Sequence, residues 1–358
     1  MVIVLVFIWT FIFTHLVKAS NNDIREPFVM GYITSIDYDE EVKKIGHPYS
    51  LYIEKIRNEM VLIDSKRSKI TIYRLDNFYP VLTLDYRWGI QTPIQAQIDR
   101  KGNVYILHVV GRDLYEITIY DRALIKKSKI SFSGPIKPQR FAISSEGKIY
   151  VLVQIIGENF NSRDTQIFIY GAEGNKIGDF DFTNLKDTIQ PTEIKIDLND
   201  NIYLIDLQKG KIFVFNKNHQ FLFSFGEKGG VTGKLSQPKS IDIDEKRGIA
   251  YIVDYMRHVV NVYDLKNEGR YLFEFGGYGY DIGWFQFPSC VSLDIQGRVY
   301  VADTLNKRVQ VLTPYEGKAG LINPIPKNRV VKHFKELLEQ YDEKKITQDI
   351  RFSENFFF

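Results

Sequence analysis

Carboxylate and imidazole side chains are the groups in this chain with the clearest capacity for chemistry. Four aspartates recur at the ends of short apolar runs, and a ring of carboxylate oxygens is a ligand set that suits Ca²⁺. Because each aspartate holds the same place in its run, a structural role that repeats along the chain accounts for them equally well. We therefore expect no cofactor, with calcium as the alternative. The four residues are Asp64, Asp206, Asp254 and Asp303.

The histidines do not form a comparable series. A zinc site needs several imidazole nitrogens that converge with tetrahedral geometry. The histidines that follow the N-terminal segment do not hold matching positions in successive runs, so the sequence does not predict a zinc site. It also lacks the G-x-S-x-G, H-E-x-x-H and phosphate-loop patterns. These five histidines are His47, His108, His219, His258 and His333.

The elements that would position these side chains follow a repeat. Six prolines, spaced by 45 to 53 residues, each open a unit, and every unit contains an apolar run that ends in the same register. Self-similarity at this period is typical of repeat architectures. The prolines are Pro48, Pro93, Pro138, Pro191, Pro238 and Pro288, and the runs span residues 60–64, 104–108, 149–153, 202–206, 250–254 and 299–303.

Each unit reads as four short strands. Alternating or β-branched runs such as 70–73, 117–120, 167–170 and 309–312 are typical of half-buried strands. Six such units predict an all-β fold, a six-bladed β-propeller of four-stranded antiparallel blades. The sixth unit supplies only three strands. We expect the run 28–36 to complete it as the outer strand, because that pairing removes two exposed sheet edges.

The second half of the chain resembles NHL repeats. Two copies of one phrase, 225–238 and 275–288, share their glycines and proline, and the run 297–311 (GRVYVADTLNKRVQV) matches the repeat pattern closely. The resemblance is specific over residues 190–315 and weaker over 48–190, where His108 and Val153 stand in place of the preferred aspartate. It implies the propeller fold more firmly than any function.

The same resemblance implies an enzymatic alternative. Six-bladed propellers related to NHL repeats include a zinc-dependent lyase and calcium-dependent lactonases, whose sites lie in the central channel. The resemblance therefore leaves open a metal-dependent (calcium or zinc) hydrolase or lyase, and we name no catalytic or metal-ligating residue for it.

Composition limits the classes of partner. The net charge is only +3 among 358 residues, which argues against a dedicated nucleic-acid-binding protein. Aromatic residues make up 14% of the chain, enough for a sizeable core. The single cysteine, Cys290, lies in an apolar stretch, and we expect a buried, unreactive thiol.

The two ends of the chain are expected to lie outside the propeller, which we place at residues 28–315. Residues 1–19 are largely apolar and end in Val17-Lys18-Ala19, so we expect a signal peptide, or an uncleaved N-terminal membrane anchor. The protein would then be secreted, or held in the periplasm or cell envelope. Residues 316–358 are expected to form a linker, an amphipathic helix and a phenylalanine-rich tail.

Strand parity identifies the face that we expect to bind. In a four-stranded blade, the turn between the second and third strands emerges on the same side as the linker to the next blade. Basic and aromatic side chains of both sets of loops therefore share one rim, which suits protein or glycan recognition. The binding-face candidates are Lys66, Arg67, Trp88, Lys209, Arg257, His258, Tyr278, Tyr280, Trp284 and Lys307.

Three classes of function stay open. The sequence favours a noncatalytic extracytoplasmic propeller that binds a protein or glycan partner, does not bind nucleic acid, and touches the membrane only through its N-terminal segment. The metal-dependent enzyme is the second class. The third is a structural component of a cell-surface assembly, attached through the C-terminal helix and phenylalanine-rich tail, residues 327–358.

Overall fold

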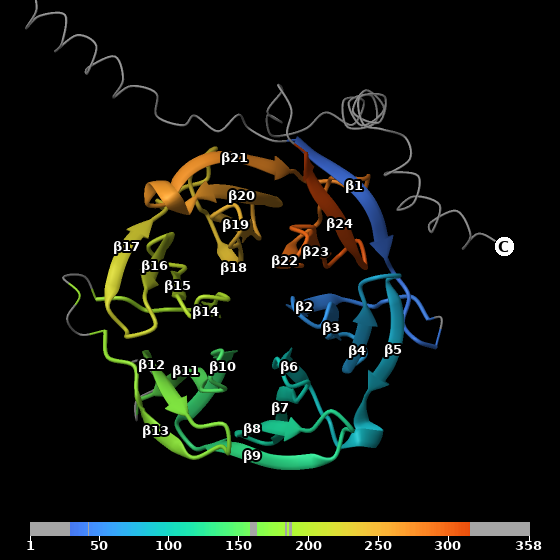
Figure 1. Ribbon diagram of the computed structural model, residues 1–358, viewed down its shortest axis with the longest axis vertical. Coiled ribbons are helices and arrows are strands. Elements are labelled where there is room, and N and C mark those ends of the chain that lie inside the picture. The colour runs from blue at the N-terminus through green and yellow to red at the C-terminus, as the bar shows by residue number, and fades with distance from the viewer. Residues whose placement is uncertain (1–28, 42, 158–162, 183–184, 186–187, 316–358) are drawn as a thin grey trace, which may run out of the picture.

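Six antiparallel sheets of four strands surround one central axis (Figure 1). The computed structural model describes residues 29–315 except 42, 158–162, 183–184 and 186–187. This arrangement confirms the predicted six-bladed propeller. The segments 1–19 and 316–358, for which a leader and a helical tail are predicted, lie outside the described residues.

Blades 1 to 3 follow one another along the chain, and each begins with its innermost strand. The innermost strands surround the axis in Figure 1. Blade 1 contains β2 (Pro48–Glu54), β3 (Glu59–Asp64), β4 (Lys69–Arg74) and β5 (Tyr79–Leu84). Blade 2 contains β6 (Pro93–Ile98), β7 (Val104–Gly111), β8 (Leu114–Tyr120) and β9 (Lys126–Ser133), and blade 3 contains β10 (Ile136–Ile143), β11 (Ile149–Ile156), β12 (Arg163–Tyr170) and β13 (Lys176–Asp179).

Blades 4 to 6 repeat the pattern, except that the last blade takes its outer strand from the start of the chain. Blade 4 contains β14 (Glu193–Ile196), β15 (Ile202–Asp206), β16 (Lys211–Phe215) and β17 (Phe221–Phe225). Blade 5 contains β18 (Pro238–Asp244), β19 (Ile249–Asp254), β20 (Val259–Asp264) and β21 (Arg270–Gly276), and blade 6 contains β22 (Pro288–Leu293), β23 (Val299–Asp303), β24 (Arg308–Tyr315) and β1 (Val29–Ile36).

The ring closes where β1 pairs with β24. The pairing is antiparallel and runs from Val29 opposite Tyr315 to Ile36 opposite Val309, with a shift between Tyr32 and Thr34. The predicted closing strand is therefore confirmed. Since β1 covers the free edge of β24, blade 6 has the same four strands as its neighbours.

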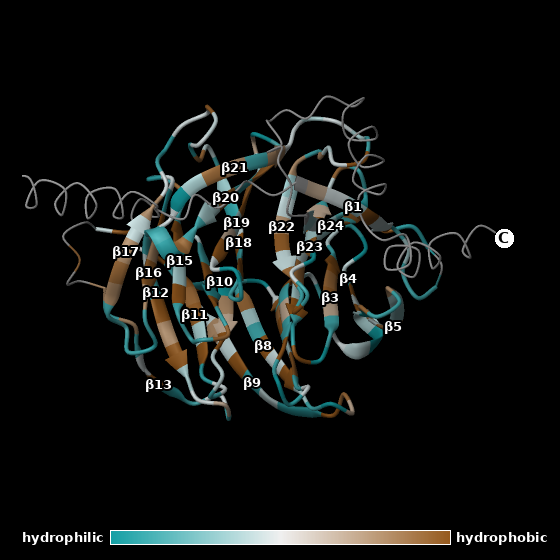
Figure 2. Cartoon of the chain, turned by 45° about the horizontal axis from the view of Figure 1, so that its top comes forward, coloured by the Kyte–Doolittle hydropathy of each residue, from teal (hydrophilic) through white to brown (hydrophobic). Residues whose placement is uncertain are grey.

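Hydrophobic side chains pack between blades. The described residues contain six clusters of buried apolar side chains, one at each interface between neighbouring blades. Figure 2 shows the hydrophobic residues concentrated along the strands, whereas the connecting turns are mostly hydrophilic. Each blade thus depends on two neighbours for the burial of its faces, as expected of a repeat protein.

Helical structure is minor in the described part of the chain. It consists of two short 3₁₀ turns, η1 (Tyr86–Trp88) and η2 (Leu265–Asn267). Among the described residues there is no helix with the length and apolar character needed to cross a membrane.

The recurring aspartates hold the linkers between blades. Each sits at the end of a second strand, and its carboxylate accepts backbone N–H bonds from the linker just before the same blade begins. Asp254 accepts from Ser236 at 2.6 Å and from Gln237 at 3.0 Å. Asp64, Asp206 and Asp303 do the same with the amides of Gly46 and His47, of Gln190, and of Gln286.

His108 performs this task in blade 2, where the repeat lacks its aspartate. Its Nδ1 accepts from the Gln91 amide at 3.4 Å, and its Nε2 bonds the Thr118 hydroxyl at 3.0 Å. Burial lowers the pKa of His108, so the ring is neutral near pH 7 and Nδ1 keeps its lone pair. The histidine therefore replaces a carboxylate in a structural role.

Replacing His108 with alanine is expected to lower the free energy of unfolding by about 1–3 kcal/mol, because the Gln91 amide and Thr118 hydroxyl lose their partner. Denaturant unfolding measures the change. The variant His108→Asp restores the acceptor that other blades use, and its free energy of unfolding should lie closer to that of the wild type. Equal stability of the alanine variant and the wild type would contradict this role.

The repeated phrase at 225–238 and 275–288 has a steric basis. Gly226 and Gly276 adopt positive φ angles of 87° and 102°. A Cβ atom at these positions would lie 2.9 Å from the Leu235 side chain and 2.6 Å from the Phe285 side chain. The linker side chains that plug the blade junctions therefore require glycine at both sites.

Candidate functional site: the loop face and the channel

One face of the ring collects two sets of loops. In four blades the aspartate bonds bring the end of the second strand against the linker that precedes the same blade, as the bond from Ser236 to Asp254 shows. The turns between second and third strands and the linkers between blades therefore share a face, which we call the loop face. Its position agrees with the one expected from strand parity.

Exposed apolar side chains concentrate on the loop face. Seventeen large apolar residues are exposed in the described part of the chain, and most of the others lie on outer strands. Clustering of this kind marks interaction surfaces better than single exposed residues do. The loop-face members are Tyr38, Tyr86, Trp88, Val231, Met256, Tyr278, Tyr280, Ile282 and Leu305.

The largest concentration lies where blades 5 and 6 meet. We define the loop-face patch as Met256, Tyr278, Tyr280, Ile282 and Leu305. Each of these residues is between 39% and 66% exposed. Two contacts join the linker between blades 5 and 6 to the turns on either side of it. The rings of His258 and Tyr278 meet at 5.0 Å, and Asn306 Nδ2 donates to the Gly279 carbonyl at 2.9 Å.

Six predicted binding residues are exposed on the loop face, and one of them, Arg67, also forms an ion pair. Tyr278 and Tyr280 belong to the patch, and Trp88 is partly exposed on η1. Lys66 and Lys307 are exposed in the turns that follow β3 and β23. These six side chains are placed where a partner can reach them.

Arg67 and the other four predicted residues make contacts within the propeller. Arg257 forms a bidentate pair with Glu274, at 2.6 and 2.5 Å, and its guanidinium also donates to the Lys234 carbonyl. Arg67 pairs with Asp39 at 3.5 Å. Lys209 is half-buried, and its amide donates to Asp206.

His258 and Trp284 also support the loops. His258 Nδ1 accepts from the Phe287 amide at 2.9 Å, and desolvation lowers the pKa of the ring. Trp284 packs over Gly279, where a Cβ atom would lie 3.0 Å from the tryptophan Cβ. Both side chains therefore shape the linker that carries Tyr278 and Tyr280.

Local ion pairs across the second hairpins differ between blades. Arg308 pairs with Asp303, five residues before it in the chain, at 2.9 Å. Lys69 instead contacts Glu41 at 2.8 Å and Asp39 at 3.4 Å, because the linker before blade 1 places these carboxylates beside its ammonium.

The inner edges of several blades are capped by side chains of the preceding blade. The free edge of an innermost strand presents unpaired N–H and C=O groups to the channel. Gln95 and Gln97 of β6 bond the amide and the carbonyl of Phe141 in β10, at 2.7 and 2.8 Å. In blade 6 the Ser240 hydroxyl accepts from the Val291 amide, and the Asp242 carboxylate accepts from the Leu293 amide.

Cys290 takes part in the same capping. Its thiol donates to the Leu51 carbonyl at 3.3 Å and lies 3.4 Å from the Ser240 hydroxyl. Burial raises the pKa of the Cys290 thiol, which disfavours the reactive thiolate. This environment agrees with the expected unreactive cysteine.

Charged side chains meet across the channel. Near the loop face, Arg140 of blade 3 bonds Glu193 of blade 4 at 2.9 Å and the hydroxyl of Tyr49 in blade 1 at 3.3 Å. Deeper in the channel, Lys195 of blade 4 pairs with Asp242 of blade 5 at 2.9 Å. Blades 1 and 3 are not neighbours, so the bond between Tyr49 and Arg140 crosses the channel.

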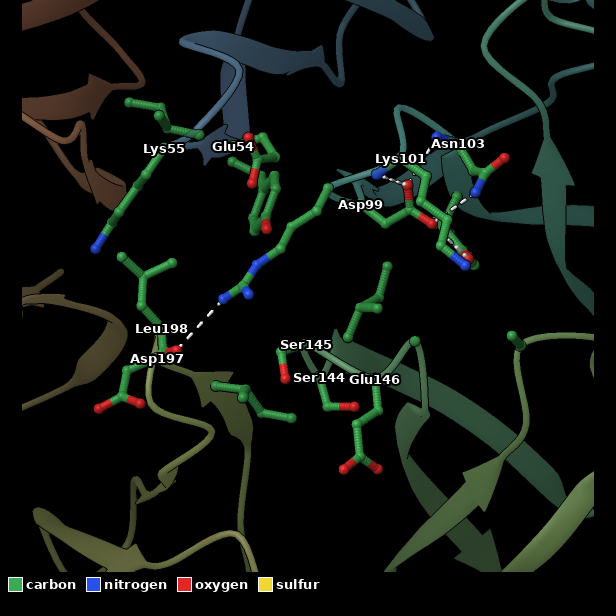
Figure 3. A pocket seen from close by; sticks show the side chains of 18 of the residues that line it. Glu54, Lys55, Asp99, Lys101, Asn103, Ser144, Ser145, Glu146, Asp197 and Leu198 are labelled. Carbon is green, nitrogen blue, oxygen red and sulfur yellow. Dashed lines mark hydrogen bonds between the residues drawn. The ribbon is translucent and has the colours of Figure 1, made fainter.

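A cavity of about 170 Å³ lies at the other end of the channel, where the innermost strands end (Figure 3). Blades 1 to 5 contribute to its wall, and charges of both signs line it. Lys55 forms an ion pair with Glu245 at 2.8 Å, and Arg100 donates to the Leu198 carbonyl at 3.3 Å. The sequence did not indicate this cavity, because its residues come from turns without a common motif.

The residues at the axis do not fit a channel metal site. Glu193, Asp242 and Glu245 are carboxylates along the channel, and each accepts bonds from a cation. The repeat aspartates hold linker amides. Within the described residues, no group of three or more His, Cys, Asp or Glu side chains is arranged to hold a metal ion.

Comparisons with solved structures identify the fold. The chain is similar to a structural genomics protein of unknown function from Bacteroides thetaiotaomicron (14% identity, TM-score 0.57, covering 80% of this chain and 75% of that one). It is also similar to an auxiliary nutrient binding protein from Bacteroides ovatus (16%, 0.56, 81% and 78%) and to virginiamycin B lyase from Staphylococcus aureus (13%, 0.51, 80% and 99%). At these identities the likeness shows the fold alone.

Family models agree with the architecture. Residues 186–275 match a family described as 6-bladed beta-propeller, and residues 285–312 match the NHL repeat. No curated protein matches the chain. The chain therefore contains an NHL repeat and a six-bladed β-propeller domain, in agreement with the resemblance seen in its sequence.

Proposed function

We propose that this chain is a noncatalytic, extracytoplasmic binding protein that recognises another macromolecule through its loop face. The observation that carries the proposal is the loop-face patch, where five large apolar side chains are exposed together at the junction of blades 5 and 6. Exposed apolar surface of this kind is a common property of protein interaction sites.

The chemistry of the patch favours a protein over a glycan. Sugar rings stack on aromatic side chains, and Tyr278 and Tyr280 suit either partner. Met256, Ile282 and Leu305 add aliphatic surface. Burial of this surface stabilises a complex with a protein more than a complex with a glycan. The exposed ammonium of Lys307 at the rim suits an acidic partner.

Two further observations support the proposal. Solved structures with this fold include auxiliary nutrient binding proteins from Bacteroides ovatus and Bacteroides thetaiotaomicron, so the architecture serves binding elsewhere. The apolar N-terminal segment supports a location outside the cytoplasm, either secreted or in the cell envelope.

Replacing both Tyr278 and Tyr280 with serine is expected to weaken partner binding at least about 10-fold, because exposed tyrosines carry much of the energy of such interfaces. Pull-down from native envelope extract identifies the partner, and titration of the purified partner measures the affinity. The fold should be unaffected, because both side chains are exposed.

The matched control is Tyr79→Ser, which removes a 54% exposed tyrosine from the outer strand β5, away from the patch. Full binding by this control and loss by the double variant support the proposal. Equal binding by all three proteins contradicts it. Binding that a purified glycan reproduces, and that no protein does, assigns the face to glycan recognition.

A further inference from the structure

A β-bulge recurs at the start of the innermost strands. In five blades the pairing between the first and second strands shifts directly after the proline, so the next residue has no partner opposite it. Bulges redirect side chains and are frequent beside functional sites. The bulged residues are Tyr49, Ile94, Gln139, Lys239 and Ser289.

Lys239 carries a half-buried positive charge at this level of the channel. Its ammonium lies 4.3 Å from the ring centre of Tyr255 and 5.0 Å from that of Tyr49. No carboxylate among the described residues forms an ion pair with it. Half-buried cations are normally paired, so an ammonium held only against two aromatic faces has donor capacity left for a ligand.

Tyr49 supplies a second donor at the same place. Its hydroxyl accepts from Arg140 Nη2 at 3.3 Å, so its own proton is left to donate. Arg140 is fixed in turn by Glu193 at 2.9 Å and by the Gln139 carbonyl at 2.8 Å. The positions of these groups are therefore set by contacts within the propeller.

The balance of charge selects the ligand. Two cations, Arg140 and Lys239, stand against the single carboxylate of Glu193, which leaves one positive charge uncompensated. A singly charged anion neutralises it, whereas Glu193 would repel the second charge of a phosphate. The aromatic ring of Tyr49, whose centre lies 5.0 Å from the Lys239 ammonium, suits a flat ring attached to that anion.

We propose that the loop-face mouth of the channel binds a small organic acid, whose carboxylate lies between the Lys239 ammonium and the Tyr49 hydroxyl. The acid carries a ring, aromatic or sugar, that packs against Tyr49. This inference goes beyond the proposed function, because a small ligand in the channel and a macromolecule on the loop-face patch bind independently.

Ring acids and their neutral counterparts test the site. Isothermal titration calorimetry of the full chain compares benzoate with benzyl alcohol and glucuronate with glucose. At least one acid is expected to bind with a Kd of about 1 mM or tighter, and its neutral counterpart at least about 10-fold more weakly. Failure of both acids to bind, or equal binding by the neutral compounds, overturns the proposal.

Variants assign the binding to this site. Lys239→Met removes the charge and keeps a long apolar side chain, and it should weaken binding of the acid at least about 10-fold. Lys239→Arg should retain most of the affinity. The control Lys246→Met removes an exposed lysine from the turn after β18 and should change nothing. Equal binding by Lys239→Met and the wild type, with both folded by circular dichroism, overturns the assignment.

Discussion

A chain that lacks residues 1–36 is expected to lose about 5 kcal/mol or more of its free energy of unfolding, which is a large part of the stability of an ordinary domain. Two losses combine in this deletion. The edge of β24 loses its pairing with β1, and two interblade cores lose one buried side chain each. Met30 packs between blades 5 and 6, and Ile36 packs between blades 6 and 1.

The matched control is the chain that lacks only residues 1–28, because it keeps all of β1. Thermal unfolding followed by circular dichroism compares the two deletions. The control should unfold near the wild-type temperature, while the chain without β1 should unfold well below it or fail to fold. If both deletions unfolded at one temperature, β1 would not be the element that closes the ring.

The fold could be predicted because the residues that recur along the chain are residues that the strands require. Prolines begin four of the innermost strands, at Pro48, Pro93, Pro238 and Pro288. In blade 3 the strand instead starts at Ile136, because pairing with β11 extends beyond Pro138. Strand length there depends on a partner strand, which the proline spacing does not reveal.

The candidate site could be predicted only in part. Tyr278 and Tyr280 are exposed as the loop pattern indicates, whereas Phe285 of the same linker is fully buried. The guanidinium of Arg257 was expected to face a partner, but Glu274 holds it. The sequence shows the charge of a residue and not the carboxylate that the next hairpin brings beside it.

Lys239 and its surroundings gave no signal in the sequence. The bulged position carries a different type of residue in each blade, so it lacks the recurrence that revealed the aspartates. Its contacts also come from three blades, since Tyr49 belongs to blade 1 and Arg140 to blade 3. Only closure of the ring brings these side chains together.

Closure also creates the most heavily bonded charge at the axis. Asp242 is fully buried, and its carboxylate contacts Lys195 at 2.9 Å and Lys55 at 3.8 Å. It also accepts from the Ser292 hydroxyl at 3.0 Å and from the Leu293 amide at 2.7 Å. One side chain thus joins blades 1, 4, 5 and 6.

Replacing Asp242 with asparagine is expected to lower the free energy of unfolding at pH 7 by about 3–5 kcal/mol, because removing one member of a buried ion pair leaves an uncompensated charge. Denaturant unfolding measures the loss. The control Ser292→Ala removes one neutral partner of the carboxylate and the acceptor of the Ile53 amide, and it should cost about 1–3 kcal/mol. An asparagine variant no less stable than this control would contradict the role of Asp242.

The pH dependence of stability gives a second test of Asp242. Burial alone would raise the pKa of this carboxyl, but Lys195 and Lys55 outweigh it and the pKa is lowered. The unfolded chain therefore binds the proton at a higher pH than the folded chain, and stability rises with pH between the two pKa values. The contribution of Asp242 to stability is fully present above the unfolded-state pKa of about 3.9 and is lost as the pH falls through the folded-state pKa.

The difference in stability between the wild type and Asp242→Asn should accordingly stay constant from neutral pH to about pH 5 and shrink in stronger acid. A difference that is the same at every pH would show that the ionised carboxylate is not what stabilises the axis.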